Sequence, residues 1–232
     1  MDKRMRSWVL AGCLTLSVAA SAAETESPKT APPAPPAEIT VAGPSAAEPS
    51  DASANPFEDV KADSPFLPGI LYAVDKGITK GTTPKTFSPY MLCTRGQILT
   101  FLWRAWGSPE PADDNPFPDL EPEAYYYKAA LWSYQMGLLD GTSFDPYGYC
   151  TRLDAVVYLW KLAGAPASYD SRKGEFPFTD VSDNPDAQNA VAWAALESFV
   201  TNGTTATTFS PDKRCTRSQI VTFIYRALGG NP

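Results

Sequence analysis

Apolar residues recur with helical spacing in three stretches of this chain, and each stretch follows the same three residues. Cys-Thr-Arg stands at 93–95, 150–152 and 215–217, and the first copy continues with Ile98, Leu99, Leu102 and Trp103. Such a stripe is typical of a helix with one face turned to a core. The pattern predicts helices over residues 95–106, 152–162 and 217–228. Each is closed by a Gly, which suits a left-handed helix end.

The Thr of each copy is predicted to be a helix N-cap. A Gln or Asp follows it three residues later, which is the spacing of a capping box. In that motif the Thr hydroxyl accepts an N–H of the first turn, and the later side chain returns to the N–H of the Thr. The predicted pairs are Thr94 with Gln97, Thr151 with Asp154, and Thr216 with Gln219.

The Arg of each copy falls in the first helical turn, where the helix dipole disfavours a cation. Arg95, Arg152 and Arg217 share this placement, and its repetition indicates a purpose. One interpretation is an anionic partner, since Arg offers a planar fork for a carboxylate or phosphate. The alternative is an Arg that stacks on a neighbouring aromatic ring or pairs with an Asp of the next repeat. The sequence leaves both open for each Arg.

Further motifs show that each predicted helix start belongs to a repeat of roughly sixty residues. Such a period indicates a repeat architecture. Each repeat opens with an aromatic residue, a variable residue, Asp and an aliphatic residue, at 57–60, 117–120 and 178–181. Short helices are predicted next, over 69–76, 125–136 and 187–198. Each repeat is therefore read as a helix–turn–helix hairpin, and three hairpins must pack together to bury their apolar faces.

Glycines stand at two positions of the turn that follows the short helix. Gly77 and Gly137 are predicted to cap the short helices with left-handed geometry. The third repeat has Ser198-Phe199 in that place and one extra residue before Gly203. Phe-x-Pro then precedes each Cys-Thr-Arg. The Asp residues of the three opening segments are expected in turns or caps rather than in contact with a ligand; they are Asp59, Asp119 and Asp180.

The first 55 residues do not fit the repeat pattern. Residues 1–23 combine a basic start, an apolar run and Ala20-Ser21-Ala22, which predicts a secretory signal peptide too short to span a membrane. Residues 24–55 are rich in Ala, Pro, Ser and Glu and predict a disordered spacer. The net charge is −7 over 232 residues, and removal of a basic leader makes it more negative. An acidic exported chain is a poor candidate for nucleic acid or for an anionic membrane surface.

The cysteine and histidine content limits the kinds of functional site that the chain can form. Cys93, Cys150 and Cys215 remain after signal removal, each one residue before a predicted cap. A buried thiol that packs as a small hydrophobe is favoured over a shared disulfide or a three-thiolate metal site, which would lack a fourth ligand. The chain has no His, the commonest general base and metal ligand. We expect no metal, no cofactor and no catalytic residue.

The ordered set of motifs resembles the S-layer homology (SLH) domain. The signature of that domain is an aromatic-x-Asp-Val start, a Trp-containing helix that ends in Gly-Ile or Gly-Leu, a Phe-x-Pro, and a helix start like Thr-Arg-Ala-Glu. The resemblance covers residues 57–229, as repeats at 56–109, 116–166 and 177–230. It implies an all-α fold in which three tandem helix–turn–helix repeats pack as a pseudo-threefold bundle, with grooves between neighbouring repeats.

The resemblance also implies a function. Such modules hold exported proteins non-covalently on Gram-positive cell walls by binding a secondary cell-wall polysaccharide, often with a pyruvylated terminal sugar that carries a carboxylate. The Arg of the Thr-Arg motif lines the groove in that family, so this role falls here on Arg95, Arg152 and Arg217. A glycine turn would let the backbone approach the sugar closely, and the glycines in that place are Gly81, Gly141 and Gly203.

This sequence departs from the family pattern at several positions. The acidic residue after Thr-Arg is replaced by Gln97 and Gln219 and is Asp154 in the middle copy; Tyr72 replaces the Trp of the first repeat. Trp132 and Trp193 are candidate groove walls, with packing in the core as the favoured alternative. The Tyr125–Tyr127 run could present one face to the core and another to a groove. Because the repeats are unequal, we expect only one or two grooves to bind.

Two other classes of function compete with a wall anchor. A glycoside hydrolase of the wall polymer would need a pair of carboxylates, and no acidic pair interrupts the repeats. A protein–protein interaction scaffold would show an exposed apolar patch and indifference to Arg substitution. The sequence therefore predicts a secreted, cell-wall or cell-surface associated anchor without enzyme activity. Its expected partner is a secondary cell-wall polysaccharide or a peptidoglycan-linked glycan, with a surface protein as the second candidate.

Overall fold

The computed structural model describes residues 55–141, 143–168 and 176–230, and these residues form α-helices joined by long turns. The predicted signal peptide and nearly all of the predicted spacer lie outside the described residues. No helix in the described ranges is long and apolar enough to cross a membrane. The all-α prediction is confirmed. The helices are α1 (Leu67–Asp75), α2 (Arg95–Ala105), α3 (Tyr127–Gln135), α4 (Arg152–Leu162), α5 (Pro185–Ala192) with the π-helix η2 (Trp193–Glu197), and α6 (Arg217–Ala227).

Helices α2, α4 and α6 begin with the same capping box. In each, the Thr hydroxyl accepts the backbone N–H three residues on, and that residue's side chain accepts the N–H of the Thr. In α4 the two distances are 3.1 Å, from Asp154 N to Thr151 Oγ1, and 2.9 Å, from Thr151 N to Asp154 Oδ2. Local sequence alone therefore fixes where these helices start. Each ends at a glycine with positive φ, namely Gly107, Gly164 and Gly229.

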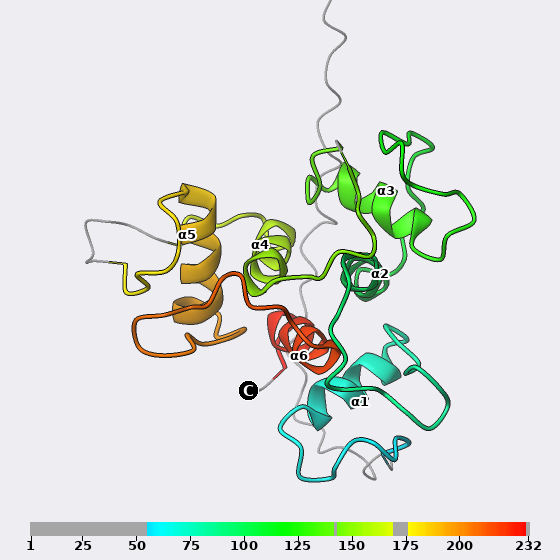
Figure 1. The fold of residues 1–232 in the computed structure, drawn as a ribbon, viewed down its shortest axis with the longest axis horizontal. Helices are drawn as coiled ribbons and strands as arrows, with labels where there is room; N and C mark the ends of the chain where they lie inside the picture. Colours follow the sequence, from blue (N-terminus) through cyan, green and yellow to red (C-terminus); the bar gives the residue numbers. More distant parts are fainter. Residues whose placement is uncertain (1–54, 142, 169–175, 231–232) are drawn as a thin grey trace, which may run out of the picture. The chain divides into compact units, whose positions relative to one another are not determined.

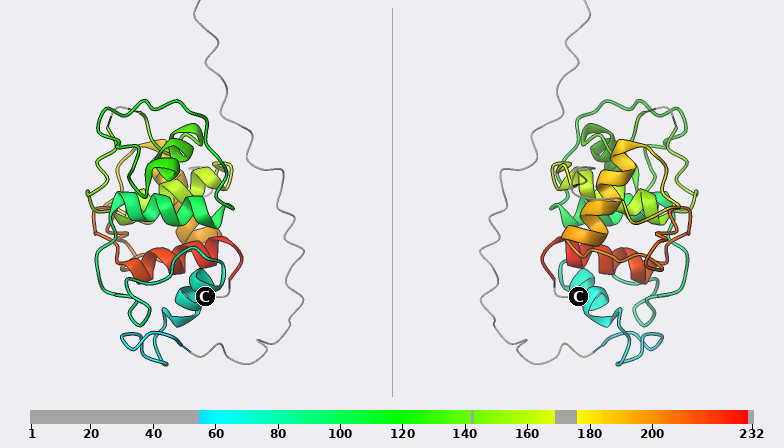
Figure 2. Two further views of the ribbon diagram at one scale, coloured as in Figure 1. Left: turned by 90° about the vertical axis from the view of Figure 1, so that its right-hand side faces the viewer. Right: turned by 90° about the vertical axis from the view of Figure 1, so that its left-hand side faces the viewer.

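The first helix of each repeat packs on the second helix of the preceding repeat. Thus α3 packs on α2, α5 packs on α4, and α1 closes the ring on α6. Helices α2, α4 and α6 lie together at the centre, with α1, α3 and α5 outside them (Figure 1). The side views show α2 and α6 next to each other (Figure 2). The bundle is pseudo-threefold as predicted, but the two helices of one predicted hairpin are not each other's main partners.

Backbone hydrogen bonds through the three cysteines join the starts of the central helices. Cys93 N donates to Cys215 O at 2.8 Å, Cys150 N to Cys93 O at 2.9 Å, and Cys215 N to Cys150 O at 2.9 Å. Each Cys therefore donates once and accepts once, and the three bonds close a ring. The thiols are buried and free, which confirms that interpretation of the sequence. Among the described residues, no cluster of His, Cys, Asp and Glu is placed to hold a metal ion.

The Phe of each Phe-x-Pro is fully buried and packs on the Phe that opens its own repeat. The ring centroids are 5.6 Å apart for Phe57 and Phe87, and the other two repeats are similar. The opening Asp holds the same turn, because the carboxylate of Asp59 accepts the N–H groups of Phe87 and Ser88 at 2.8 and 2.7 Å. Ser88 has a φ of 59°, so these bonds stabilise a left-handed residue. Asp119 and Asp180 do the same, and the turn role predicted for all three is confirmed.

The third repeat holds its extra residue inside the helix. After α5 the chain continues into η2, where Ser198 N donates to Trp193 O at 2.8 Å. A π-turn contains one residue more than an α-turn, so it absorbs an insertion. Phe199, with a φ of 52°, then stands where Gly77 and Gly137 stand in the other repeats. The sequence placed the extra residue in the turn before Gly203; the structure places it earlier, in η2.

Candidate functional site

Each Arg of the Thr-Arg motifs reaches the Phe-x-Pro turn of the next repeat around the ring. The guanidinium donates to the carbonyl of the buried Phe, at 3.1 Å for Arg95 to Phe144, 3.0 Å for Arg152 to Phe209, and 3.1 Å for Arg217 to Phe87. The backbone N–H groups of the first helical turn also donate to carbonyls of that neighbouring turn. A cation is tolerated at these helix starts because carbonyl oxygens of the next repeat surround it.

Arg152 is buried and donates to several acceptors within the protein. Its Nη2 donates to Asn202 O at 2.8 Å and to Thr201 Oγ1 at 3.4 Å. Its guanidinium lies over the ring of Phe209, with Cζ 4.7 Å from the centroid, and the residue is only 5% exposed. Burial lowers the pKa of Arg152. Here the stacking alternative describes the structure, and Arg152 joins two repeats rather than facing a ligand.

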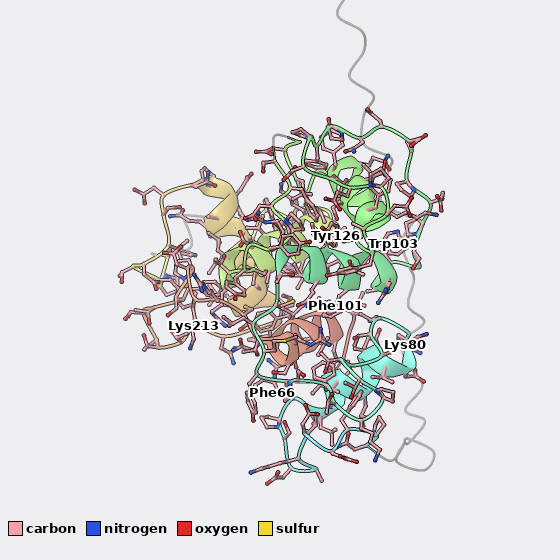
Figure 3. The ribbon with its side chains drawn as sticks, turned by 45° about the vertical axis from the view of Figure 1, so that its right-hand side comes forward. Phe66, Lys80, Phe101, Trp103, Tyr126 and Lys213 are labelled. Atoms are coloured by element: carbon pink, nitrogen blue, oxygen red, sulfur yellow. The ribbon has the colours of Figure 1, made fainter. Side chains whose placement is uncertain are left out.

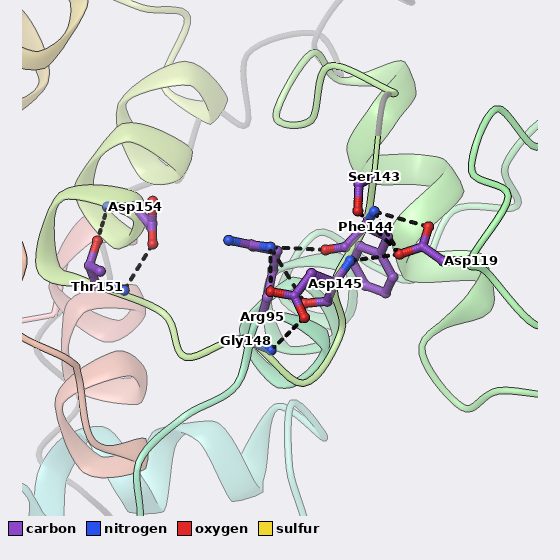
Figure 4. A network of polar contacts seen from close by, with 8 residues as sticks. All are labelled: Arg95, Asp119, Ser143, Phe144, Asp145, Gly148, Thr151 and Asp154. Carbon is purple, nitrogen blue, oxygen red and sulfur yellow. Dashed lines mark hydrogen bonds and ion pairs between the residues drawn. The ribbon is translucent and has the colours of Figure 1, made fainter.

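Arg95 is partly exposed and partly neutralised. Its Nη1 lies 3.4 Å from Asp145 O and 3.5 Å from Asp145 Oδ2, in addition to its bond with Phe144 (Figure 4). A cavity of about 410 Å³, here called the Arg95 groove, opens beside it. Its lining includes Leu138, Leu139, Asp140, Ser143, Tyr158 and Lys161. Arg95 therefore contributes to a groove, but with an acidic partner already in contact.

Arg217 is buried, 4% exposed, and not fully paired. Its guanidinium lies over the rings of Phe87 and Phe101, with Cζ 5.0 and 5.3 Å from the centroids. Its Nη2 is buried and has no hydrogen-bond partner among the described residues. Burial lowers the pKa of Arg217, yet an arginine remains charged at neutral pH. A buried cationic donor without a partner is costly, and a bound acceptor would relieve that cost.

A cavity of about 610 Å³, here called the Arg217 groove, lies against this side chain. Its lining includes Thr79, Lys80, Gln97, Phe101, Arg104 and Tyr125. Figure 3 labels Lys80, on the turn after α1, and Phe101, on α2. No Asp or Glu appears among the described residues that line this groove. The cavity has the size of ordinary small-ligand sites.

The two grooves are equivalent positions of successive repeats. The turn from Gly77 to Gly81 lines the Arg217 groove, and the turn that begins at Gly137 lines the Arg95 groove. A basic residue of the central helix donates to each turn: Arg104 Nη1 to Ile78 O at 3.1 Å, and Lys161 Nζ to Gly137 O at 2.7 Å. A cation nine residues after each Thr-Arg Arg is visible in the sequence, but its contact with the turn is not.

The predicted glycines serve their own turns. A Cβ on Gly81 would lie 2.6 Å from Thr86 O and 2.7 Å from a ring carbon of Phe57, and Gly81 has a φ of +88°. A Cβ on Gly141 would lie 2.8 Å from a ring carbon of Tyr134, and one on Gly203 would clash with Thr205 O and Phe178. Glycine is therefore required by internal packing at these positions, rather than by the approach of a sugar. Gly81 also lines the Arg217 groove.

The predicted tryptophans lie outside both grooves. Trp132 is 5% exposed and belongs to the hydrophobic core, because α3 packs its buried face on α2. Trp193 is half-buried at the junction of α5 and η2 and packs against the core. The aromatic wall comes instead from Tyr125, which is exposed and lines the Arg217 groove, while Tyr126 beside it is buried. The two faces suggested by the Tyr run are thus both used.

A closed ring of helical repeats, with cation-lined cavities between repeats, defines a repeat module with clefts between its repeats. The S-layer homology domain model matches residues 56–99 and 177–221. The chain therefore carries S-layer homology domains and belongs to that family. Residues 116–166, between the two matched segments, have the same cap, the same Arg-to-Phe bond and the same place in the cysteine ring.

The relatives include enzymes and surface proteins. An endoglucanase of Bacillus sp. (strain KSM-635) is 30% identical over 176 residues, which is 73% of this chain and 18% of the endoglucanase. An S-layer protein of Bacillus thuringiensis subsp. finitimus is 28% identical over 188 residues, 76% of this chain and 22% of that protein. A cell surface protein of Thermoanaerobacter kivui is 28% identical over 123 residues, 49% of this chain and 16% of that protein. The chain thus spans less than a quarter of these relatives.

Proposed function

We propose that this protein is a non-covalent cell-surface anchor that binds an acidic cell-wall polysaccharide in its inter-repeat grooves. The observation that carries the proposal is the Arg217 groove, a cavity that is lined by Arg217, Lys80 and Arg104 and by no carboxylate, beside an arginine whose buried Nη2 has no hydrogen-bond partner among the described residues. The names of the relatives support a surface location, since two of them are an S-layer protein and a cell surface protein.

The groove offers suitable chemistry for a sugar acid. A carboxylate would accept charge-assisted hydrogen bonds from Arg217, which are stronger than neutral ones. The Gln97 amide can pair with a sugar hydroxyl, and the exposed ring of Tyr125 suits the C–H side of a sugar ring. No step of bond making or breaking is required. The proposed role is therefore binding rather than catalysis, at the cell wall of a Gram-positive bacterium.

The partner we propose is a secondary cell-wall polysaccharide, in which a ketal-linked pyruvate would supply the carboxylate, or another peptidoglycan-linked glycan. The test is sedimentation of the full chain with purified Gram-positive sacculi, with and without prior removal of the secondary polymer by mild acid. Binding should require the polymer and should weaken strongly in Arg217→Ala. The matched control is Arg214→Ala, which removes an exposed Arg stacked on Tyr149, outside both grooves.

Either of two results would overturn the proposal. Sedimentation that persists after removal of the polymer would exclude the polymer as the ligand. Equal loss in Arg214→Ala and Arg217→Ala would show that only net charge matters. A protein partner would then be the better candidate, because Tyr90 and Tyr147 are exposed by 75% and 77%.

A further inference from the structure

The three repeats place different residues just before the second glycine of the turn. Lys80, Asp140 and Asn202 occupy this position, and the turn around it forms a wall of each groove or its equivalent. The turns start alike, since Gly77, Gly137 and Phe199 all have positive φ; the second glycine has positive φ at Gly81 and Gly141 but not at Gly203. The charge at this position is therefore one of the differences between the three sites.

The charged side chains that line the Arg217 groove are all cations. Lys80 is exposed on its wall, and the positive side chains of Arg104 and Arg217 complete the lining. Asp59 is the carboxylate that acts on Arg217 from nearby, and it already accepts the N–H groups of Phe87 and Ser88. An anion that enters this groove would meet cationic side chains and no lining carboxylate.

The Arg95 groove has a mixed charge, because Arg95 and Lys161 line it together with Asp140. Asp140 lines it in the place of Lys80, and Asp145 lies 3.5 Å from Arg95 Nη1. The α4 cap beside it carries Asp154, where α2 and α6 carry Gln97 and Gln219. A carboxylate ligand would meet carboxylates here beside Arg95 and Lys161, and like charges at close range weaken binding. At the third position, Asn202 O already accepts from Arg152 Nη2 at 2.8 Å.

We propose that Lys80 is a specificity-determining residue: with Arg217 it selects an anionic sugar for the Arg217 groove, while Asp140 excludes that sugar from the Arg95 groove. The protein accordingly binds one acidic sugar per chain. This inference rests on the proposed function, because it assumes a glycan ligand. It adds which groove receives the charged residue of that glycan and which side chain makes the choice.

The experiment is isothermal titration of the full chain with a hexosamine glycoside that carries a pyruvate ketal, and with its methyl ester as the neutral counterpart. The wild-type chain should bind the acid at one site and the ester more weakly. Lys80→Gln should weaken binding of the acid by about tenfold, as expected for loss of one favourable charge at a binding site, and should leave the ester unchanged. Lys85→Gln is the matched control, since Lys85 is exposed in the same repeat and pairs with Glu58 at 2.9 Å.

The reciprocal variant tests the other half of the proposal. Asp140→Lys should create a second site for the acid and raise the stoichiometry from one to two, with no change at the first site. If neither glycoside nor purified wall polymer binds the wild-type chain, the proposed function itself fails. If the polymer binds but acid and ester bind alike, or Lys80→Gln has no effect, the function stands and the specificity inference is wrong. A wild-type stoichiometry of two would also overturn it.

Discussion

Arg217 and Phe87 are 130 residues apart in the chain, and the Nε of the first donates a 3.1 Å hydrogen bond to the carbonyl of the second. This bond closes the ring between the last repeat and the first. The Asp59 carboxylate holds the N–H of the same Phe87 at 2.8 Å, so one buried residue is fixed from its own repeat and from its neighbour. The same pair of bonds recurs at Phe144 and Phe209. The repeats are therefore joined by one recurring contact.

Arg152 should be the most important of the three Arg residues for stability. Its guanidinium is buried and donates to three oxygens, and a Lys in its place could not reach them with a planar fork. We expect Arg152→Lys to lower the free energy of unfolding by about 3 kcal/mol, because it leaves buried acceptors and a buried charge poorly paired.

The matched variant is Arg95→Lys, whose native side chain is 27% exposed and can exchange its bonds for water. It should cost about 1 kcal/mol or less. Both values can be measured by urea denaturation monitored through tryptophan fluorescence. Equal losses in the two variants would show that burial of Arg152 does not matter.

Gly81 and Gly77 allow a direct test of the turn. Both have positive φ, of 88° and 67°, but a Cβ on Gly77 would meet nothing within 4 Å, whereas one on Gly81 would strike Thr86 O and Phe57. We expect Gly77→Ala to cost about 1 kcal/mol for its left-handed backbone and Gly81→Ala about 3 kcal/mol in the same unfolding assay. If the two costs are the same, Gly81 is not required by internal packing, and a role in ligand approach becomes the better explanation.

The sequence predicts the features of this fold that are local in the chain. Thr94 and Gln97 are three residues apart, so their capping box can be read without knowing anything else about the molecule. The same is true of Gly77 as a helix end. The partner of Arg217 could not be predicted in this way, since it depends on how the third repeat meets the first. The packing of α1 on α6 is equally non-local.

A local motif does not predict the role of a residue when that role depends on burial in the fold. Trp132 and Trp193 occupy the same motif position, yet Trp132 is in the core and Trp193 is half-buried. The difference arises because η2 follows α5 and changes the end of the first helix of the third repeat. Lys80 and Asp140 are plain in the sequence as charges. Their importance appears only when the fold shows that they line equivalent grooves.

Asp119 should make stability depend on acid pH. The N–H groups of Asp145 and Phe144 donate to its carboxylate and lower its pKa. The unfolded chain loses these bonds and binds a proton more readily, so the stabilisation is present above about pH 4 and is lost as the pH falls through the lower, folded-state pKa.

Carboxyl NMR titration of Asp119 should place its midpoint below that of a model peptide. Asp119→Asn should remove this part of the acid sensitivity, while Asp212→Asn, in an exposed turn residue, should not. A normal midpoint for Asp119 would mean that the turn opens in solution.

The raised pKa values of the buried thiols should make these thiols unreactive near neutral pH. Burial raises the pKa of Cys93 and of Cys215 to about 12, and it raises the pKa of Cys150 well above its usual range. The thiolate is the reactive form, so at about pH 8 none of the three should be alkylated by iodoacetamide in the folded protein, and all three should be alkylated in guanidinium. Peptide mass spectrometry identifies each site.

The same shifts determine how stability changes with pH. An unfolded thiol ionises near pH 8.5, whereas the folded thiol stays protonated until about pH 12, so the folded state binds more protons between these values. The free energy of unfolding should therefore fall as the pH rises from about 8.5 towards 12. In the Cys93→Ala variant this free energy should fall less steeply over the same pH range. The backbone ring does not need the thiol, because it joins N–H and C=O groups that alanine retains. Rapid alkylation of native Cys93 at about pH 8 would instead show that the ring opens often enough to expose the centre of the bundle.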